Sequence, residues 1–270
     1  MPLDRRRLLK NLTSMMVALS IGDAFAKDKN MTNSKHLPIG VLTYDEVRSV
    51  SPALEGYTKG ALLNGLWNRS ELSARDRSIV TIAALIARMQ TIEMPFHFTL
   101  ALDNGVKPAE LSEVITHLAF YSGWANAMTA VSVAKDVFRE KGVKQDQLPL
   151  AEERLLPLNE EAEEKRATQV GNNFGAVTPG LVQNTTDLLF RDLWLRSALA
   201  PRDRSLVTVS ALIAAGQLAQ IPYHLGRAMD NGLTASEAGE IVTHIAFYAG
   251  WPNVFSAAPV VKDVLEKRTK

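Results

Sequence analysis

The chain has 270 residues, 46% of them hydrophobic, and carries 30 basic and 29 acidic side chains. This near-neutral balance excludes the strongly basic surface that nucleic-acid-binding proteins and proteins bound to anionic membranes use. The sequence contains no cysteine, which excludes disulfides, thiolate metal sites and C-x-x-C redox chemistry within it. Catalysis by this chain would have to use acids, bases, hydroxyl groups or a bound ion.

The first 26 residues resemble an export signal. Residues 4–10 (DRRRLLK) resemble the twin-arginine pattern, residues 12–21 form an apolar run, and Ala26 ends a small-x-small cleavage site. The apolar run is shorter than the roughly 20 residues that span a bilayer as a helix. We therefore expect cleavage after Ala26 and a periplasmic protein with 26 basic and 27 acidic residues, without stable membrane insertion. An uncleaved anchor and a basic tail on a cytoplasmic protein are the alternatives.

The rest of the chain contains an internal repeat. Residues 75–137 match residues 202–264 without a gap when shifted by 127 positions, and roughly half of the residues coincide. Apolar identities can follow from a shared core, but polar residues kept in register need either helix-end chemistry or a site. Four of the five histidines are in register, as the pairs His97 and His224, and His117 and His244.

Each copy is expected to be helical. Apolar residues recur at spacings of three and four from Asp76 to Met89, which predicts a first helix. A second helix should begin at residues 93–95, because proline is tolerated in a first helical turn. It should end at residues 103–105, where Gly105 can take the left-handed cap conformation.

The third helix should begin at Pro108 in the first copy and at the T-x-x-E capping box that starts at Thr234 in the second. It should end at Gly123 and Gly250, and a fourth helix should follow in each copy. These helices are expected at residues 126–141 and 253–267. Without a run of alternating β-branched residues, the sequence predicts an all-α fold of two tandem helical bundles.

The expected division is repeat 1 at 40–141, a linker with a short helix at 142–165, and repeat 2 at 166–268. A helical unit of this size has a small core and is marginal alone. We therefore expect the two copies to pack about a pseudo-twofold axis and whole chains to associate as a homo-oligomer.

The strongest candidate for chemistry is the group Gln90, Glu93 and His97, which the spacing places on one side of a helix. A histidine with its ordinary pKa of about 6.5 carries protons near neutral pH. Glu93 can fix the imidazole tautomer and favour its protonated form, or act as the base itself. Because Gln220 replaces Glu93 beside His224, the acid–base pair is expected in the first copy only. Alternatively, both histidines are helix-start residues bonded to the backbone.

A second polar stripe also recurs, as Glu113, His117 and Tyr121, and as Glu240, His244 and Tyr248. Two structural interpretations, an exposed helix face with intrahelical pairs and a buried network joining the copies, are favoured over catalysis. The aromatic residues after the helix-ending glycines, Trp124 and Trp251, are interpreted as core, with the wall of a pocket as the second interpretation.

Arginine begins the first helix of each copy, in Arg75-Asp76-Arg77 and in residues 202–204. Acidic residues are favoured at a helix start and arginines are not. The repeated arginines therefore indicate either a carboxylate partner inside the protein or an anionic ligand, which a guanidinium can hold by two hydrogen bonds. No metal site is expected, because no H-x-x-H or H-E-x-x-H pattern occurs.

Together these motifs resemble the carboxymuconolactone decarboxylase family, which shares the all-α fold of alkyl hydroperoxidase D. The resemblance rests on Arg-Asp-Arg-Ser, Glu-x-x-x-His, Asp-Asn-Gly, Glu-x-x-Glu and His-x-x-x-Tyr-x-Gly-Trp in that order. It implies acid–base removal of carbon dioxide from a small carboxylated lactone or related organic acid, without a cofactor. It implies His97 and Glu93 as catalytic residues and Arg77 and Arg204 as anion holders. The expected substrate-binding set is Arg77, Arg204, His224, Tyr121 and Trp124.

The sequence departs from the family in two ways. The hydroperoxidase branch carries C-x-x-C before the histidine, where this chain has Gln90 and Glu93, so thiol peroxidase chemistry is excluded. The name-giving decarboxylases are single-unit cytoplasmic proteins, so the substrate need not be their lactone. A cofactor-free lyase is thus the leading hypothesis. A periplasmic binding or assembly module and a metal-dependent hydrolase are the alternatives.

Overall fold

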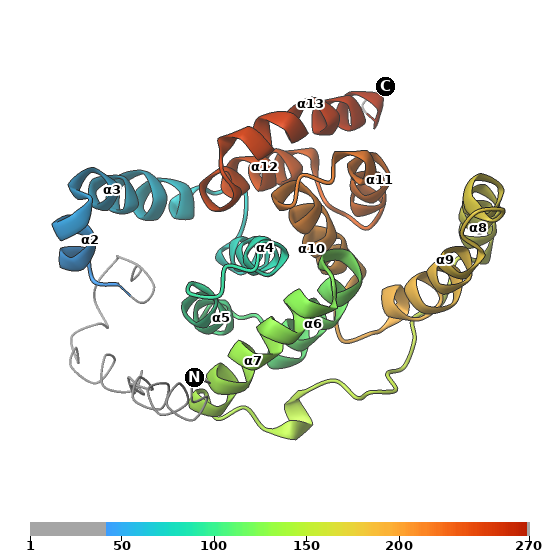
Figure 1. The fold of residues 1–270 in the computed structure, drawn as a ribbon, viewed down its shortest axis with the longest axis horizontal. Helices are drawn as coiled ribbons and strands as arrows, with labels where there is room; N and C mark the ends of the chain where they lie inside the picture. The colour runs from blue at the N-terminus through green and yellow to red at the C-terminus, as the bar shows by residue number, and fades with distance from the viewer. Residues whose placement is uncertain (1–41, 269–270) are drawn as a thin grey trace, which may run out of the picture. The chain divides into compact units, whose positions relative to one another are not determined.

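A computed structural model describes residues 42–268, and Figure 1 shows them in colour. The expected export signal lies outside the described residues. Within residues 42–268 all regular structure is helical, apart from one isolated bridge between Leu155 and Arg196. Among the described helices, none combines the length and the hydrophobicity that crossing a bilayer demands.

The first repeat contains four long helices preceded by shorter helical segments. It begins with α2 and α3, continues through a π-helix and a 3-10 turn, and then forms α4 to α7. The bounds are α2 Tyr44–Val50, α3 Pro52–Tyr57, η2 Thr58–Gly65, η3 Leu66–Asn68, α4 Ala74–Ala87, α5 Met94–Asp103, α6 Pro108–Ser122 and α7 Trp124–Glu140.

The elements from α3 to α7 recur 127 residues later as α9 to α13, which confirms two tandem bundles related by a pseudo-twofold; η4, α8 and η7 have no counterpart at this spacing among the described residues. The bounds are η4 Gln145–Gln147, α8 Glu160–Phe174, α9 Pro179–Asn184, η5 Thr185–Phe190, η6 Leu193–Leu195, α10 Pro201–Ala214, η7 Leu218–Gln220, α11 Ile221–Asp230, α12 Ala235–Ala249 and α13 Trp251–Arg268. Within the expected linker, η4 forms one short helical turn, and α8 begins at Glu160 and continues past residue 165.

The predicted helix ends are largely confirmed. The capping box is present at Thr234, whose hydroxyl accepts from the backbone of Glu237 while the Glu237 carboxylate accepts from Thr234. Helices α6 and α12 end at Gly123 and Gly250, which have positive φ values of 96° and 87°. The fourth helix begins two residues earlier than expected, because Trp124 follows this turn directly. The π and 3-10 segments were not predicted, since they lack the 3.6-residue period.

Helices α4 and α10 pack against each other at the centre of the described residues (Figure 1). Both are buried on all sides, and one continuous hydrophobic core includes Ile82 of α4 and Val209 of α10. Helix α12 packs on α4 and α6 packs on α10, so the third helix of each repeat covers the first helix of the other. This cross-repeat packing brings residues far apart in sequence into common clusters.

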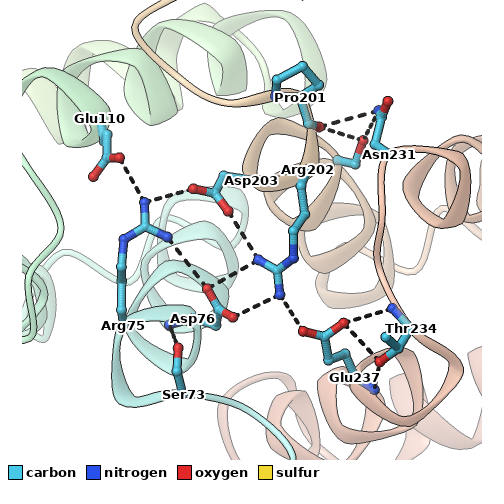
Figure 2. A network of polar contacts seen from close by, with 11 residues as sticks. Ser73, Arg75, Asp76, Glu110, Pro201, Arg202, Asp203, Asn231, Thr234 and Glu237 are labelled. Atoms are coloured by element: carbon cyan, nitrogen blue, oxygen red, sulfur yellow. Dashed lines mark hydrogen bonds and ion pairs between the residues drawn. The ribbon is translucent and has the colours of Figure 1, made fainter.

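The N-terminal ends of α4 and α10 meet in an arginine network, which consists of Arg75, Asp76, Glu110, Arg202, Asp203 and Glu237 (Figure 2). Arg75 lies 2.8 Å from the Glu110 carboxylate and 2.7 Å from that of Asp203. Arg202 lies 2.9 Å from Asp76 and also pairs with Glu237. The sequence left two possible partners for these helix-start arginines, a carboxylate inside the protein or an anionic ligand. The structure shows carboxylates inside the protein.

The carboxylates of the arginine network stabilise the charged form of its arginines. Burial alone would lower the pKa of Arg75, but the Asp203 and Glu110 carboxylates raise it above its ordinary value. Asp76 and Asp203 also lie in the first turns of α4 and α10, where negative charge is favourable. The network therefore joins the two repeats at the start of their central helices.

Replacing Arg202 by alanine is expected to lower the free energy of unfolding by about 2 kcal/mol, because partly buried carboxylates lose charged hydrogen bonds. The matched control is Arg139→Ala, which removes an exposed ion pair with Asp136 and should cost less than about 1 kcal/mol. Urea denaturation measures both values. Equal effects of the two substitutions would contradict a structural role for the arginine network.

Candidate active site

Cross-repeat packing creates two equivalent side-chain clusters, each built from both repeats. The first cluster takes four residues from the first repeat and three from the second, namely Trp67, Arg77, Thr81, His97, Glu240, His244 and Tyr248. The second cluster contains Trp194, Arg204, Thr208, His224, Glu113, His117 and Tyr121. The structure therefore separates the sequence candidates into two sites.

The base of the first cluster is an ion pair within the core. The Arg77 side chain is fully buried, and its Nη2 lies 2.8 Å from Oε1 of Glu240. Arg77 Nη1 lies 3.2 Å from Nδ1 of His244, and Nε2 of His244 lies 2.8 Å from the Thr81 hydroxyl. Because the Thr81 hydroxyl donates to the Arg77 carbonyl, Nε2 of His244 carries the proton and Nδ1 accepts from Arg77.

The second cluster repeats this arrangement. Arg204 lies 3.0 Å from Glu113, and Nε2 of His117 lies 2.7 Å from the Thr208 hydroxyl. Burial lowers the pKa of His117 and of His244 well below the ordinary value, and the neighbouring arginine lowers it further. The second polar stripe is thus a buried network joining the copies, which was one of its two structural interpretations.

Above this base, His97 lies in an aromatic enclosure. Its ring stacks on Trp67 with centroids 6.2 Å apart, and Tyr248 meets it edge-on at 5.4 Å. Trp67 Nε1 donates to the Tyr248 hydroxyl over 2.9 Å, which fixes the two rings. Nδ1 of His97 is buried without a hydrogen-bond partner, as is Nδ1 of His224 in the second cluster. Buried polar atoms are usually paired, so these two nitrogens are exceptions within the described residues.

The protonation state of His97, the residue expected to pair with Glu93, differs from the expectation. Burial lowers the pKa of His97 to about 3, so the imidazole is neutral at neutral pH. The expectation that Glu93 favours a protonated His97 is therefore wrong, because desolvation disfavours the charged form of a buried imidazole. Burial raises the pKa of Glu93, which lies half-buried at the start of α5. Burial raises the pKa of Tyr248, and the negative charge of Glu93 contributes to this rise.

The remaining candidates lie in different places. His97 and Arg77 belong to the first cluster, and Glu93 is the N-cap residue of the helix α5 that carries His97. Arg204, His224 and Tyr121 belong to the second cluster. Arg204, which the resemblance implied as an anion holder together with Arg77, does not lie beside His97, because cross-repeat packing supplies Glu240, His244 and Tyr248 there instead.

Trp124 contributes to neither cluster. Its side chain is 63% exposed at the start of α7 and contacts Phe120. Its interpretation as core is therefore wrong, because the turn at Gly123 leaves the ring on the surface.

Sequence reasoning missed the two tryptophans of the clusters. Trp67 and Trp194 are separated by the same 127 residues as the histidine pairs, so their register was a signal that could have found them. It also missed Arg227, which stands where the first repeat has Leu100 and lies over the Trp194 ring. Residues 42–268 contain no group of three side chains arranged to hold a metal ion.

The sequence is similar to a known protein family and to two characterised proteins. The sequence model of the carboxymuconolactone decarboxylase family matches residues 52–136 and 179–263, which together exceed half of the chain. A 78-residue stretch is 36% identical to the 4-carboxymuconolactone decarboxylase of Acinetobacter baylyi and covers 29% of this chain and 58% of that protein. A 75-residue stretch is 28% identical to the nitrosuccinic acid decarboxylase npaB of Metarhizium robertsii and covers 28% of this chain and 52% of that protein. The chain thus spans little more than half the length of these curated relatives.

The buried histidines predict a steep loss of stability in mild acid. As the pH falls, a histidine with a pKa of about 3 in the folded protein is protonated in the unfolded chain well before it is protonated in the folded protein. Acid therefore stabilises the unfolded chain, and the free energy of unfolding falls as the pH drops from about 6.5 toward 3. Each such histidine contributes up to about 1.4 kcal/mol per pH unit in this window. Urea denaturation at pH 7.5 and 5.0 measures the loss, and His97→Gln should make it smaller. An unchanged free energy of unfolding between these pH values would contradict the burial.

Proposed function

The chain belongs to the carboxymuconolactone decarboxylase family, and on that basis we propose that it releases carbon dioxide from a small carboxylated lactone or related organic acid without a cofactor. One observation carries the proposal: His97 presents an unpartnered Nδ1 inside an aromatic enclosure, beside a half-buried carboxyl group with a raised pKa. The two curated relatives, which are both named as decarboxylases, support the same type of reaction.

In the proposed reaction, Glu93 carries the proton and His97 holds the substrate. The bond between the carboxylate carbon and its neighbour breaks, carbon dioxide leaves, and the electron pair stays on the substrate as an enolate. Nδ1–H of the neutral His97 donates a hydrogen bond to the oxygen on which that charge develops. Glu93 in its acid form then delivers a proton to carbon and is reprotonated from water. A carboxyl group with a raised pKa suits this role.

The aromatic walls assist by removing water. Trp67 and Tyr248 surround the imidazole, and Tyr248 is itself partly buried. A carboxylate loses hydration when it enters such a site, whereas carbon dioxide is uncharged, so the enclosure disfavours the reactant more than the product. Arg77 is fully buried against Glu240, so we propose that it positions His244 instead of touching the substrate.

Glu93→Gln and His97→Ala are each expected to lower kcat by about 10²- to 10⁴-fold, because each removes one proton-handling or charge-stabilising group. Carbon dioxide release from 4-carboxymuconolactone and a panel of small carboxylated lactones measures the effect. The matched control is Gln220→Ala, which alters the equivalent position of the second cluster and should leave turnover unchanged. Full activity in purified Glu93→Gln would remove Glu93 from the mechanism.

One observation favours a competing function, a binding or assembly module without catalysis. The His97 side chain is only 7% exposed, as a purely structural histidine would be. This alternative expects no turnover on the lactone panel and a lower melting temperature for His97→Ala. Saturable release of carbon dioxide by the wild-type protein, abolished in the Glu93→Gln variant, would decide against it.

Export and self-association remain proposals that rest on the sequence. Light scattering coupled to gel filtration should give a mass that is a multiple of the single chain if whole chains associate. Mass spectrometry of protein recovered from a periplasmic extract should show a chain beginning at Lys27. A single-chain mass, or an intact N-terminus in a cytoplasmic fraction, would contradict the respective proposal.

A further inference from the structure

The second repeat contains a cleft that the first repeat's sequence does not reproduce. Its volume is about 490 Å³, and it lies between α8, the η5–η6 segment and α11. Aromatic and aliphatic side chains form much of its lining, including Phe190, Trp194, Leu195 and Tyr223. The cleft is thus large enough for a small organic molecule, and its walls suit a flat apolar one.

The charged residues of the lining are mostly cationic, with Lys165, Arg166, Arg227 and Arg268 against Glu163 and Asp230. Arg166 is neutralised by Glu163, with Nη2 to Oε1 at 2.6 Å, and Arg268 pairs with Asp230. Among the described residues, no acidic side chain lies within ion-pairing distance of Arg227, and its Nε is buried without a hydrogen-bond partner. Arg227 is therefore a cation held in the cleft without a counter-charge.

Aromatic rings hold this arginine in place. The guanidinium of Arg227 lies 4.2 Å from the centre of the Trp194 ring and 5.4 Å from that of Phe190. Contacts of this kind restrain a guanidinium by its face and leave its edge donors free. A fixed fork of N–H groups matches the two oxygens of a carboxylate.

The cleft adjoins the second cluster. Trp194 also stacks on His224, with ring centroids 6.0 Å apart and an angle of 12° between the planes. Burial, and to a lesser extent the charge of Arg227, lower the pKa of His224 to about 4. In the first repeat the equivalent of Arg227 is Leu100, a buried hydrophobic residue, so this charge is specific to the second repeat.

We propose that the cleft is a second, non-equivalent ligand site that binds a small organic carboxylate with a flat apolar body. The carboxylate lies on Arg227, and the body lies against Phe190 and Tyr223. The volume and the apolar lining distinguish this ligand class from inorganic anions, which need neither. The inference stands on the cleft and its unpaired cation, and it does not depend on turnover at Glu93 and His97.

Isothermal titration calorimetry of the full chain with benzoate tests the proposal, with benzamide as the uncharged isostere and inorganic phosphate as the small anion. Benzoate is expected to bind saturably at one site per chain, at least tenfold more tightly than benzamide or phosphate. Arg227→Leu, which copies Leu100, should weaken benzoate binding at least tenfold, and Arg227→Lys should weaken it less. The matched control Arg139→Leu removes one exposed charge elsewhere and should leave the affinity unchanged.

Three results would overturn the proposal: equal benzoate affinity in wild-type protein and Arg227→Leu, equal affinity for benzoate and benzamide, or tighter binding of phosphate. If Arg227→Leu does not fold, Arg227→Gln replaces it, because glutamine keeps a polar side chain beside Trp194. Glu93→Gln separates this site from the proposed catalytic one, since it should abolish turnover and keep benzoate binding. Loss of benzoate binding in Glu93→Gln alone would place the ligand in the first cluster and refute the cleft site.

Discussion

The structure depends on two arginines that are buried at the centre of the fold. A buried guanidinium without a partner costs several kcal/mol, so each must meet a carboxylate inside the protein. Arg77 and Arg204 find theirs in Glu240 and Glu113, which belong to the opposite repeats. Each buried arginine therefore requires a carboxylate from the other repeat, which ties the third helix of each repeat to the first helix of the other.

The same packing across the repeats builds two clusters with identical buried polar residues. The two clusters differ only in the residues around this buried base. The arginine, threonine and histidine of the base are the same in both clusters, because changing any of them would leave a buried polar group unpaired. Residues around the buried base are not restricted in this way. The position of Glu93 in the first repeat is occupied by Gln220 in the second, and the position of Leu100 is occupied by Arg227. The first site therefore carries an acid, and the second a cation beside an open cleft.

Much of the fold was predictable because local signals specified it. Apolar spacing, the capping box at Thr234 and the glycines at 123 and 250 located the long helices. Arginines at two helix starts correctly indicated a carboxylate partner as one of two possibilities. The composition of the clusters was not predictable, because the pairing of Trp67 with Tyr248 is a contact across 181 residues. The low pKa of His97 also escaped prediction, since burial is a property of packing and not of spacing.

The joining of both units in one polypeptide has an evolutionary consequence. If two identical chains supplied these helices to each other, every inherited substitution would appear in both sites at once. A leucine-to-arginine change at the position of Leu100 and Arg227 would then alter both clusters together. Within a single gene, such a mutation changes the surroundings of one cluster and leaves those of the other unchanged. Fusion thus allows one half to keep an ancestral task while the other diverges toward a new one.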